Sequence, residues 1–207
     1  MNHHIFLDLQ TTFESLNFDD INQDRKTNLL NLSKFVQRKL VSGQIVNLNF
    51  ICTHNSRRSH LAQIWAQAAA YYCNLDNVFC YSGGTEATAL FPATANALVE
   101  SGFEIDHLSK GNNPIYMIKF ADLLLPVIGF SKTYDHRFNP QSGFAAVMTC
   151  SHADDNCPVV TGADMRFSLP FEDPKAFDGT AIQSEQYLER SLQIATEMLF
   201  IFKNVKV

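Results

Sequence analysis

The sequence predicts an α/β fold of three layers, in which a small, mainly parallel β-sheet lies between helices. Two observations lead to this prediction. The 207 residues are 46% hydrophobic, which is typical of a globular chain that buries a sizeable core. Short apolar runs also alternate with longer segments of helical character, and a βαβα order implies parallel strands that helices cover.

The N-terminal part of the chain is expected to be helical over residues 18–42. The apolar residues that recur there at helical spacing are Leu29, Leu30, Leu32, Phe35, Val36 and Leu40. Asp19 and Asp20 are the candidate N-terminal caps, and Gly43 is a natural stop. We interpret residues 1–44 as an N-terminal helical extension and residues 45–207 as the main domain.

Two βα units follow. The apolar run Ile45–Cys52 predicts a buried strand, and after the polar loop 53–58 an Ala- and Gln-rich helix is expected from about Ser59 to Cys73. The second unit consists of the strand Val78–Ser82, a turn at Gly83-Gly84 and the helix Pro92–Ser101. The polar loop therefore lies where a strand ends and a helix begins, which is where open α/β sheets bind ligands.

The second half of the domain is less regular, and residues 113–143 are interpreted as an insertion. The segments expected there and beyond are the strands Ile115–Phe120 and Leu123–Ile128, the polar loop Phe130–Gly143, a central strand Phe144–Cys150, a weaker strand Arg166–Leu169 and a terminal helix Ser184–Phe202. The stretch Ser131–Arg137 either lines the mouth of a site or is a solvated loop, and its polarity favours the loop.

The polar loop carries the clearest chemical pattern, Cys-x5-Arg-Ser, from Cys52 to Ser59. Backbone N–H groups of such a loop bind a tetrahedral oxyanion, the following helix adds positive partial charge, and Arg58 can grip two oxygens. The same positive surroundings stabilise a thiolate, so Cys52 is the predicted nucleophile. The oxyanion loop comprises Thr53, His54, Asn55, Ser56, Arg57, Arg58 and Ser59.

Charge and hydropathy exclude several other functions. The net charge of −5 and the pI of about 5.7 argue against a nucleic-acid-binding protein. No apolar run approaches the roughly 18–20 residues that span a membrane. Met1–Gln10 has no signal-peptide pattern, so we expect a cytoplasmic protein whose five cysteines are free, catalytic or redox-active.

The segment Phe50–Ser59 resembles the active-site loop of low-molecular-weight protein tyrosine phosphatases, and more closely that of the thioredoxin-coupled arsenate reductases built on the same fold. Tyr81–Ala87 and Phe91–Ala93 follow in the family's order, and Glu172-Asp173-Pro174 resembles its acid motif. This resemblance spans roughly residues 46–205. It implies a four-stranded, mainly parallel sheet flanked by helices, and it implies that Asp173 is the general acid.

A second cysteine pair, Cys150-x6-Cys157-Pro158, resembles the redox segment of the arsenate reductases. The resemblance implies that Cys52 and then Cys157 form disulfides with Cys150, and that thioredoxin recharges the pair. We expect residues 150–160 to be mobile. Two other interpretations remain open: Cys150 and Cys157 are ordinary buried residues, or they bind zinc together with His152.

The favoured function is therefore arsenate reduction, with an external thioredoxin-type reductant and no bound cofactor. Gln63 stands where some family reductases carry a glutamate that helps to bind potassium, so no metal ion is predicted. Cys73 and Cys80 are interpreted as core residues. One alternative function is hydrolysis of phosphomonoesters through a phosphocysteine, and another is a non-catalytic module that binds oxyanions.

Overall fold

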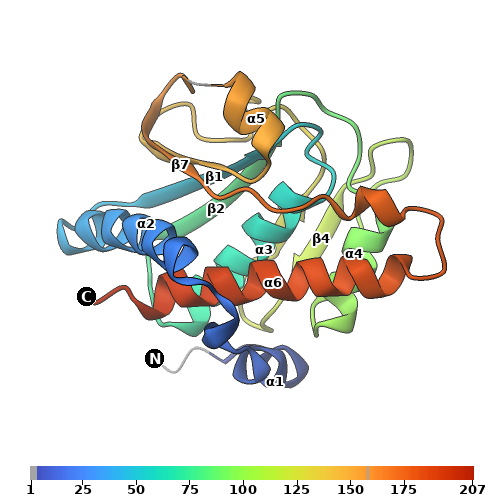
Figure 1. The fold of residues 1–207 in the computed structure, drawn as a ribbon, viewed down its shortest axis with the longest axis horizontal. Helices are drawn as coiled ribbons and strands as arrows, with labels where there is room; N and C mark the ends of the chain where they lie inside the picture. The colour runs from blue at the N-terminus through green and yellow to red at the C-terminus, as the bar shows by residue number, and fades with distance from the viewer. Residues whose placement is uncertain (1–3, 158) are drawn as a thin grey trace.

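The computed structural model describes residues 4–157 and 159–207, and a four-stranded parallel sheet forms its centre (Figure 1). The strand order is β2-β1-β6-β7. The strands are β1 (Val46–Cys52), β2 (Val78–Gly84), β6 (Phe144–Met148) and β7 (Ala163–Ser168). The predicted small parallel sheet between helices is thus confirmed. Gly83 and Gly84 end β2, whereas a turn was expected there.

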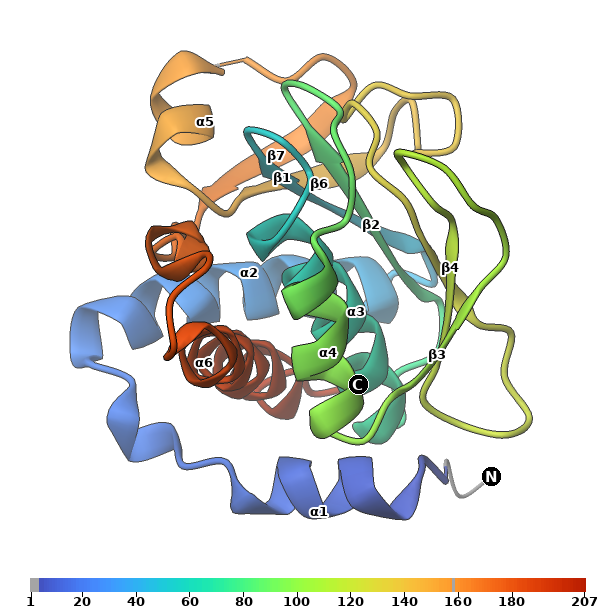
Figure 2. The ribbon, with the colours of Figure 1, turned by 90° about the vertical axis from the view of Figure 1, so that its right-hand side faces the viewer.

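Most helices lie on one face of the sheet (Figure 2). They are α1 (Leu7–Ser15), α2 (Gln23–Val41), α3 (Arg58–Tyr72), α4 (Pro92–Glu100) and α6 (Gln183–Lys203). The short helix α5 (Ser151–Asn156) lies across the opposite face, against β1 and β6. Within the part of the chain that the structure describes, no helix has a stretch long and apolar enough to cross a bilayer.

Strand β6 shows how the sequence fills both faces of the sheet. All five of its residues are buried. Ala145 and Val147 belong to the main core under α2, α3 and α6, whereas Phe144, Ala146 and Met148 belong to a second apolar cluster on the face of α5. Successive side chains of a strand point to opposite faces, so a continuous apolar run suits a central strand.

The N-terminal helix begins later than the sequence predicted. Residues Phe18–Asp20 form a separate 3₁₀ turn (η1), and α2 starts after Asn22, whose side chain accepts a hydrogen bond from Arg25 N at 2.8 Å. The prediction that Asp19 and Asp20 cap the helix was therefore wrong, since Asn22 is the cap. Gly43, at φ +67°, follows the end of α2 as expected. Helix α1 was not predicted.

A second, antiparallel sheet consists of β3 (Glu104–His107), β4 (Tyr116–Lys119) and β5 (Val127–Gly129). Strand β3 was not predicted. The strand expected at Leu123–Ile128 shrinks to β5, because Pro126 has no N–H to donate to a ladder and Leu123 and Leu125 are 97% and 90% exposed. A 3₁₀ turn, η2 (Pro174–Phe177), precedes α6.

Phe13 joins α1 to the main core, and its truncation tests whether α1 folds with the domain. The ring packs edge-on against Trp65 at 5.4 Å and stacks on Tyr72 at 4.9 Å. Phe13→Ala is expected to lower the free energy of unfolding by about 3–5 kcal/mol, measured by urea denaturation. Leu7→Ala, at a position 76% exposed, is the control and is expected to change it by less than about 0.5 kcal/mol. Equal effects of the two changes would contradict the packing role of α1.

Candidate active site

The oxyanion loop joins the end of β1 at Cys52 to the start of α3 at Arg58. It lies at the carboxyl ends of the parallel strands, as the sequence predicted. Gly84, at the end of β2, approaches the loop closely: a Cβ atom there would lie 2.6 Å from Thr53 O and 2.8 Å from Asn55 N. Only glycine allows this approach, so the end of β2 helps to fix the path of the loop.

The loop carbonyl groups bond outward to the surrounding protein. The carbonyl of Thr53 accepts from Glu86 N at 2.8 Å, that of His54 from Ser131 Oγ at 3.0 Å, and that of Ser56 from Phe91 N at 3.0 Å. In a trans peptide the N–H points opposite to the carbonyl. The N–H groups that follow these carbonyls therefore point away from the outer contacts, which is the arrangement that binds an anion.

The Cys52 thiol is held at the base of this loop and is 3% exposed. Its sulfur lies 3.0 Å from Ser59 Oγ and accepts a hydrogen bond from Asn55 N at 3.2 Å. Asn55 has a φ of +43°, a left-handed conformation that asparagine tolerates. Its side chain donates to Ser59 Oγ at 2.9 Å. Asn55 and Ser59 are thus the residues that brace the sulfur.

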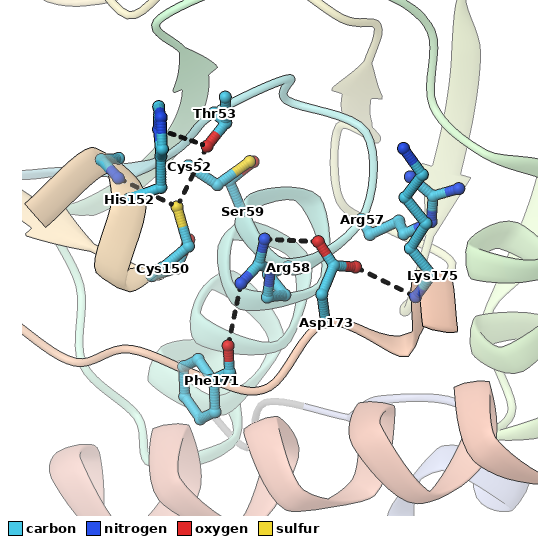
Figure 3. Close-up of polar contacts among 12 residues, drawn as sticks. Cys52, Thr53, Arg57, Arg58, Ser59, Cys150, His152, Phe171, Asp173 and Lys175 are labelled. Carbon is cyan, nitrogen blue, oxygen red and sulfur yellow. Dashed lines mark hydrogen bonds and ion pairs between the residues drawn. The ribbon is translucent and has the colours of Figure 1, made fainter. Parts of the chain in front are cut away.

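Arg58 reaches from α3 to a segment far along the chain (Figure 3). Its Nη1 donates to the carbonyl of Phe171 at 2.9 Å, and its Nη2 donates to Asp173 Oδ2 at 2.5 Å. The other oxygen of Asp173 accepts from the backbone N–H of Lys175 at 3.1 Å. The predicted anion-binding arginine and the predicted acid, 115 residues apart, therefore stand side by side next to the loop.

The Arg57 side chain has other partners than that of Arg58. Its guanidinium donates to Tyr187 Oη and to Asp178 Oδ2, each at 2.5 Å, and it lies 4.2 Å from the centre of the Phe91 ring. Burial, followed by the hydrogen bond to Asp178, raises the pKa of Tyr187. Asp178 already balances the charge of Arg57. What Arg57 offers an oxyanion is therefore its backbone.

Cys150 lies in the same apolar cluster as Cys52 and is 1% exposed. Its sulfur is 3.5 Å from Thr53 Oγ1, and it accepts a hydrogen bond from the N–H of Ala153 at 3.3 Å. The thiol is therefore near the oxyanion loop, in contact with the residue that follows Cys52 (Figure 3). All five cysteines of the chain are free.

Cys157 is half-buried and packs against this cluster at the far end of α5. The segment between the two cysteines forms the helix α5, which the sequence did not predict. Arg166 of β7 holds this helix in place. Its guanidinium donates to the carbonyl and the carboxylate of Asp154 and to Cys157 O. Pro158, the last residue of the redox pattern, lies outside the described residues.

The segment Ser131–Arg137, which follows β5, differs in part from its prediction. Ser131–Arg137 was favoured as a solvated loop, yet Ser131 and Lys132 are each only 2% exposed. Ser131 bonds the loop carbonyl of His54, and Lys132 N donates to Asn55 Oδ1 at 2.9 Å. The start of the segment is buried because it supplies these donors to the back of the oxyanion loop, whereas Asp135 and Arg137 are exposed as predicted.

A buried cation and a buried imidazole lie behind the loop. Lys132 Nζ donates to Phe130 O at 3.3 Å and sits 4.6 Å from the centre of the Phe130 ring. Burial lowers the pKa of Lys132 to about 7. Burial, and then the charge of Lys132, lower the pKa of His60 to about 3. His60 is therefore neutral at pH 7, and its Nδ1 lies 3.3 Å from Asn55 Nδ2. The sequence did not predict that either group is buried behind the loop.

The other two cysteines and Gln63 are engaged elsewhere. Burial raises the pKa of Cys73 to about 11 and that of Cys80 further, which disfavours their thiolates. The Gln63 amide donates to Cys80 O at 3.1 Å and accepts from Ser82 Oγ at 2.6 Å. Over residues 4–157 and 159–207, no group of three or more His, Cys, Asp or Glu side chains is placed to hold a metal ion.

Comparison with known proteins finds no matching family model. Among curated proteins, the arsenate reductase of Brevibacillus brevis is 30% identical over 125 residues, which cover 60% of this chain and 74% of that protein. The arsenate reductase of Bacillus subtilis is 28% identical over 141 residues, which cover 68% of this chain and 83% of that protein.

The fold is shared with a solved phosphatase. A low molecular weight phosphotyrosine phosphatase from Vibrio cholerae O395 superposes with a TM-score of 0.52 over 76% of this chain and 95% of its own, at 14% identity. This likeness supports the fold, and the predicted family fold is therefore confirmed.

Replacing Lys132 tests the cost of its buried charge. The pKa of Lys132 is about 7 in the folded chain, below the ordinary value of 10.5 for lysine. Between these two pH values the unfolded chain binds more protons than the folded chain, so the free energy of unfolding rises with pH. Each unit of pKa difference corresponds to about 1.4 kcal/mol. Lys132→Met is expected to remove this rise, measured by urea denaturation from pH 6 to 10. The exposed Lys110→Met is the control and should retain it. An unchanged rise in Lys132→Met would contradict the assignment.

Proposed function

We propose that this chain, which belongs to the arsenate reductase family, reduces arsenate to arsenite through a relay of Cys52, Cys150 and Cys157. One observation carries the proposal: the Cys52 and Cys150 thiols are buried in one apolar cluster, at the carboxyl ends of the neighbouring strands β1 and β6, with Thr53 beside both. A phosphatase of this fold needs one thiol, whereas a reductase needs a second thiol close to the first.

The first step uses the oxyanion loop. Arsenate, a tetrahedral oxyanion, binds to the loop N–H groups and to Arg58. Arg58 then exchanges its contact with the Asp173 carboxylate for the anion, and Asp173 remains next to the bound oxyanion. The Cys52 thiolate attacks arsenic, and Asp173 protonates the oxygen that leaves as water.

The second step moves two electrons. Cys150 attacks the Cys52 sulfur, and the arsenic–sulfur bond breaks with its electron pair left on arsenic, so As(V) leaves as As(III). A Cys52–Cys150 disulfide forms. Cys157 then attacks the Cys150 sulfur, the Cys52–Cys150 bond breaks, and the Cys52 thiolate is released. A thioredoxin-like dithiol reduces the resulting Cys150–Cys157 disulfide by exchange. The five free thiols support a reducing compartment, the cytoplasm.

One observation also favours a second candidate function. Cys52, Arg58 and Asp173 form a complete set for hydrolysis of a phosphomonoester, with Asp173 2.5 Å from Arg58. In that reaction water resolves the phosphocysteine, and Cys150 has no chemical role. The two functions share their first step and differ in what attacks the Cys52 adduct.

Cys150→Ser separates the two functions. The variant is expected to lose arsenate-dependent NADPH oxidation, measured with thioredoxin and thioredoxin reductase, because a hydroxyl does not form the disulfide that releases arsenite. Hydrolysis of p-nitrophenyl phosphate, where the wild type shows it, should persist. Arsenite production by Cys150→Ser at the wild-type rate would rule out the relay.

Two matched variants complete this test. Cys157→Ser is expected to release one arsenite per enzyme and then stop as the Cys52–Cys150 disulfide, which mass spectrometry detects. Cys73→Ser, at a half-buried cysteine outside the site, should turn over like the wild type. Hydrolysis by the wild type without arsenate-dependent oxidation would support the phosphatase instead.

A further inference from the structure

The hydroxyl of Thr53 lies between the thiol of Cys150 and the imidazole of His152 (Figure 3). Thr53 Oγ1 is 3.5 Å from Cys150 Sγ and 3.3 Å from His152 Nδ1. Cys150 is 1% exposed, whereas His152 is exposed. A line of three polar groups therefore leads from a buried sulfur to solvent.

Cys150 has to lose its proton before it can attack another sulfur, because the thiolate is the nucleophile. Within residues 4–157 and 159–207, the polar atoms in hydrogen-bonding range of Cys150 Sγ are Thr53 Oγ1 and the N–H of Ala153. The backbone N–H is a donor alone, so Thr53 is the partner that can accept the thiol proton.

Thr53 is well placed to pass that proton on. Its carbonyl is fixed by Glu86 N at 2.8 Å and by Thr85 Oγ1 at 3.2 Å. A hydroxyl both donates and accepts. Thr53 Oγ1 can therefore accept from Cys150 S–H while it donates its own hydrogen to His152 Nδ1, in the tautomer that carries the ring hydrogen on Nε2.

We propose that His152, acting through Thr53, is the base that deprotonates Cys150 for its attack on the Cys52 sulfur. The step rests on the proposed reductase function. The Cys150 proton moves to Thr53 Oγ1 as the Thr53 proton moves to His152 Nδ1. The Cys52–Cys150 bond forms, and the Cys52–arsenic bond breaks with its electron pair on arsenic. The exposed imidazolium then returns its proton to solvent.

Most of the other titratable groups near His152 are paired with an opposite charge or take part in the proposed reaction. Asp154 of the same helix is bound by Arg166, and His54 of the loop pairs with Glu86 at 3.8 Å. The remaining titratable or charged groups on the loop and the helix are Cys52, Arg57, Arg58, Cys150, Asp155 and Cys157. Imidazole is the side chain that ordinarily changes charge near neutral pH, so the step should depend on pH there.

The test is a single turnover of reduced enzyme with arsenate, quenched and assayed for arsenite from pH 5.5 to 8.5. His152→Asn keeps an acceptor near the Nδ1 position but is not a base. General base catalysis contributes about 10²–10⁴-fold, so we expect the variant to be about 100-fold slower at pH 7.5 and to lose the pH dependence. His107→Asn, on β3, is the control and should match the wild type. A wild-type rate and profile in His152→Asn would overturn the proposal.

A double variant tests the route through Thr53. Thr53→Val removes the hydroxyl and should slow the turnover as His152→Asn does. Thr53→Ser keeps a hydroxyl and should not be slowed in this way. The double variant, Thr53→Val with His152→Asn, should be no slower than Thr53→Val alone. Additive losses would overturn the proposal, since they mean that His152 acts independently of Thr53.

A measurement without arsenate separates this proposal from the proposed function. The alkylation rate of Cys150 by iodoacetamide, followed by peptide mass spectrometry in Cys52→Ser, should fall about tenfold at pH 7 when His152 becomes Asn. If the wild type makes no arsenite but this difference is present, the reductase function fails and the pairing of His152 with Cys150 stands. If arsenite is made and the alkylation rates are equal, the pairing fails alone.

Discussion

The hydrogen bonds of Asn55 are the interactions on which the rest of the site depends. Its N–H donates to the Cys52 sulfur, its side-chain amide donates to Ser59, and its side-chain oxygen accepts from Lys132 N. The left-handed backbone at this residue turns the N–H toward the sulfur. Asn55 thus joins the predicted nucleophile, the first turn of α3 and the segment after β5. A side chain without an amide at this position would lose the contacts to Ser59 and Lys132, whereas the contact to Cys52 comes from the backbone N–H.

Two consecutive arginines extend this rigidity to the predicted acid, Asp173. Arg58 holds the start of the segment at Phe171 and Asp173, and Arg57 holds its far end at Asp178. Because both arginines leave the same helix start, the acid segment cannot shift along the loop without breaking one of these pairs. Arg57 therefore serves the site by placing Asp173, although its charge is already balanced by Asp178.

The sequence predicts those parts of the site that are determined by residues close together in the chain. The strand, loop and helix around Cys52 follow from neighbouring residues and were predicted closely. Asp173 entered through a family resemblance alone, since nothing near it in the chain shows that it meets Arg58. Lys132 was predicted to be solvated as part of the polar stretch Ser131–Arg137, and its burial depends on a tertiary contact with Asn55. The start of α2 was misplaced because Asn22 competes with Asp19 and Asp20 as a cap.

The proposed relay also sets a requirement for α5. Cys150 and Cys157 stand at opposite ends of this helix, and at about 1.5 Å per residue their Cα atoms are roughly 10 Å apart. A disulfide needs Cα atoms about 4.4–6.8 Å apart, so the second exchange requires the helix to unwind. The helix is six residues long, and helices this short gain little from their own hydrogen bonds. Arg166 and Ser168 hold the helix through Asp154, and Arg166 also donates to Cys157 O. In the proposed relay, the Cys150–Cys157 disulfide forms only after such contacts break.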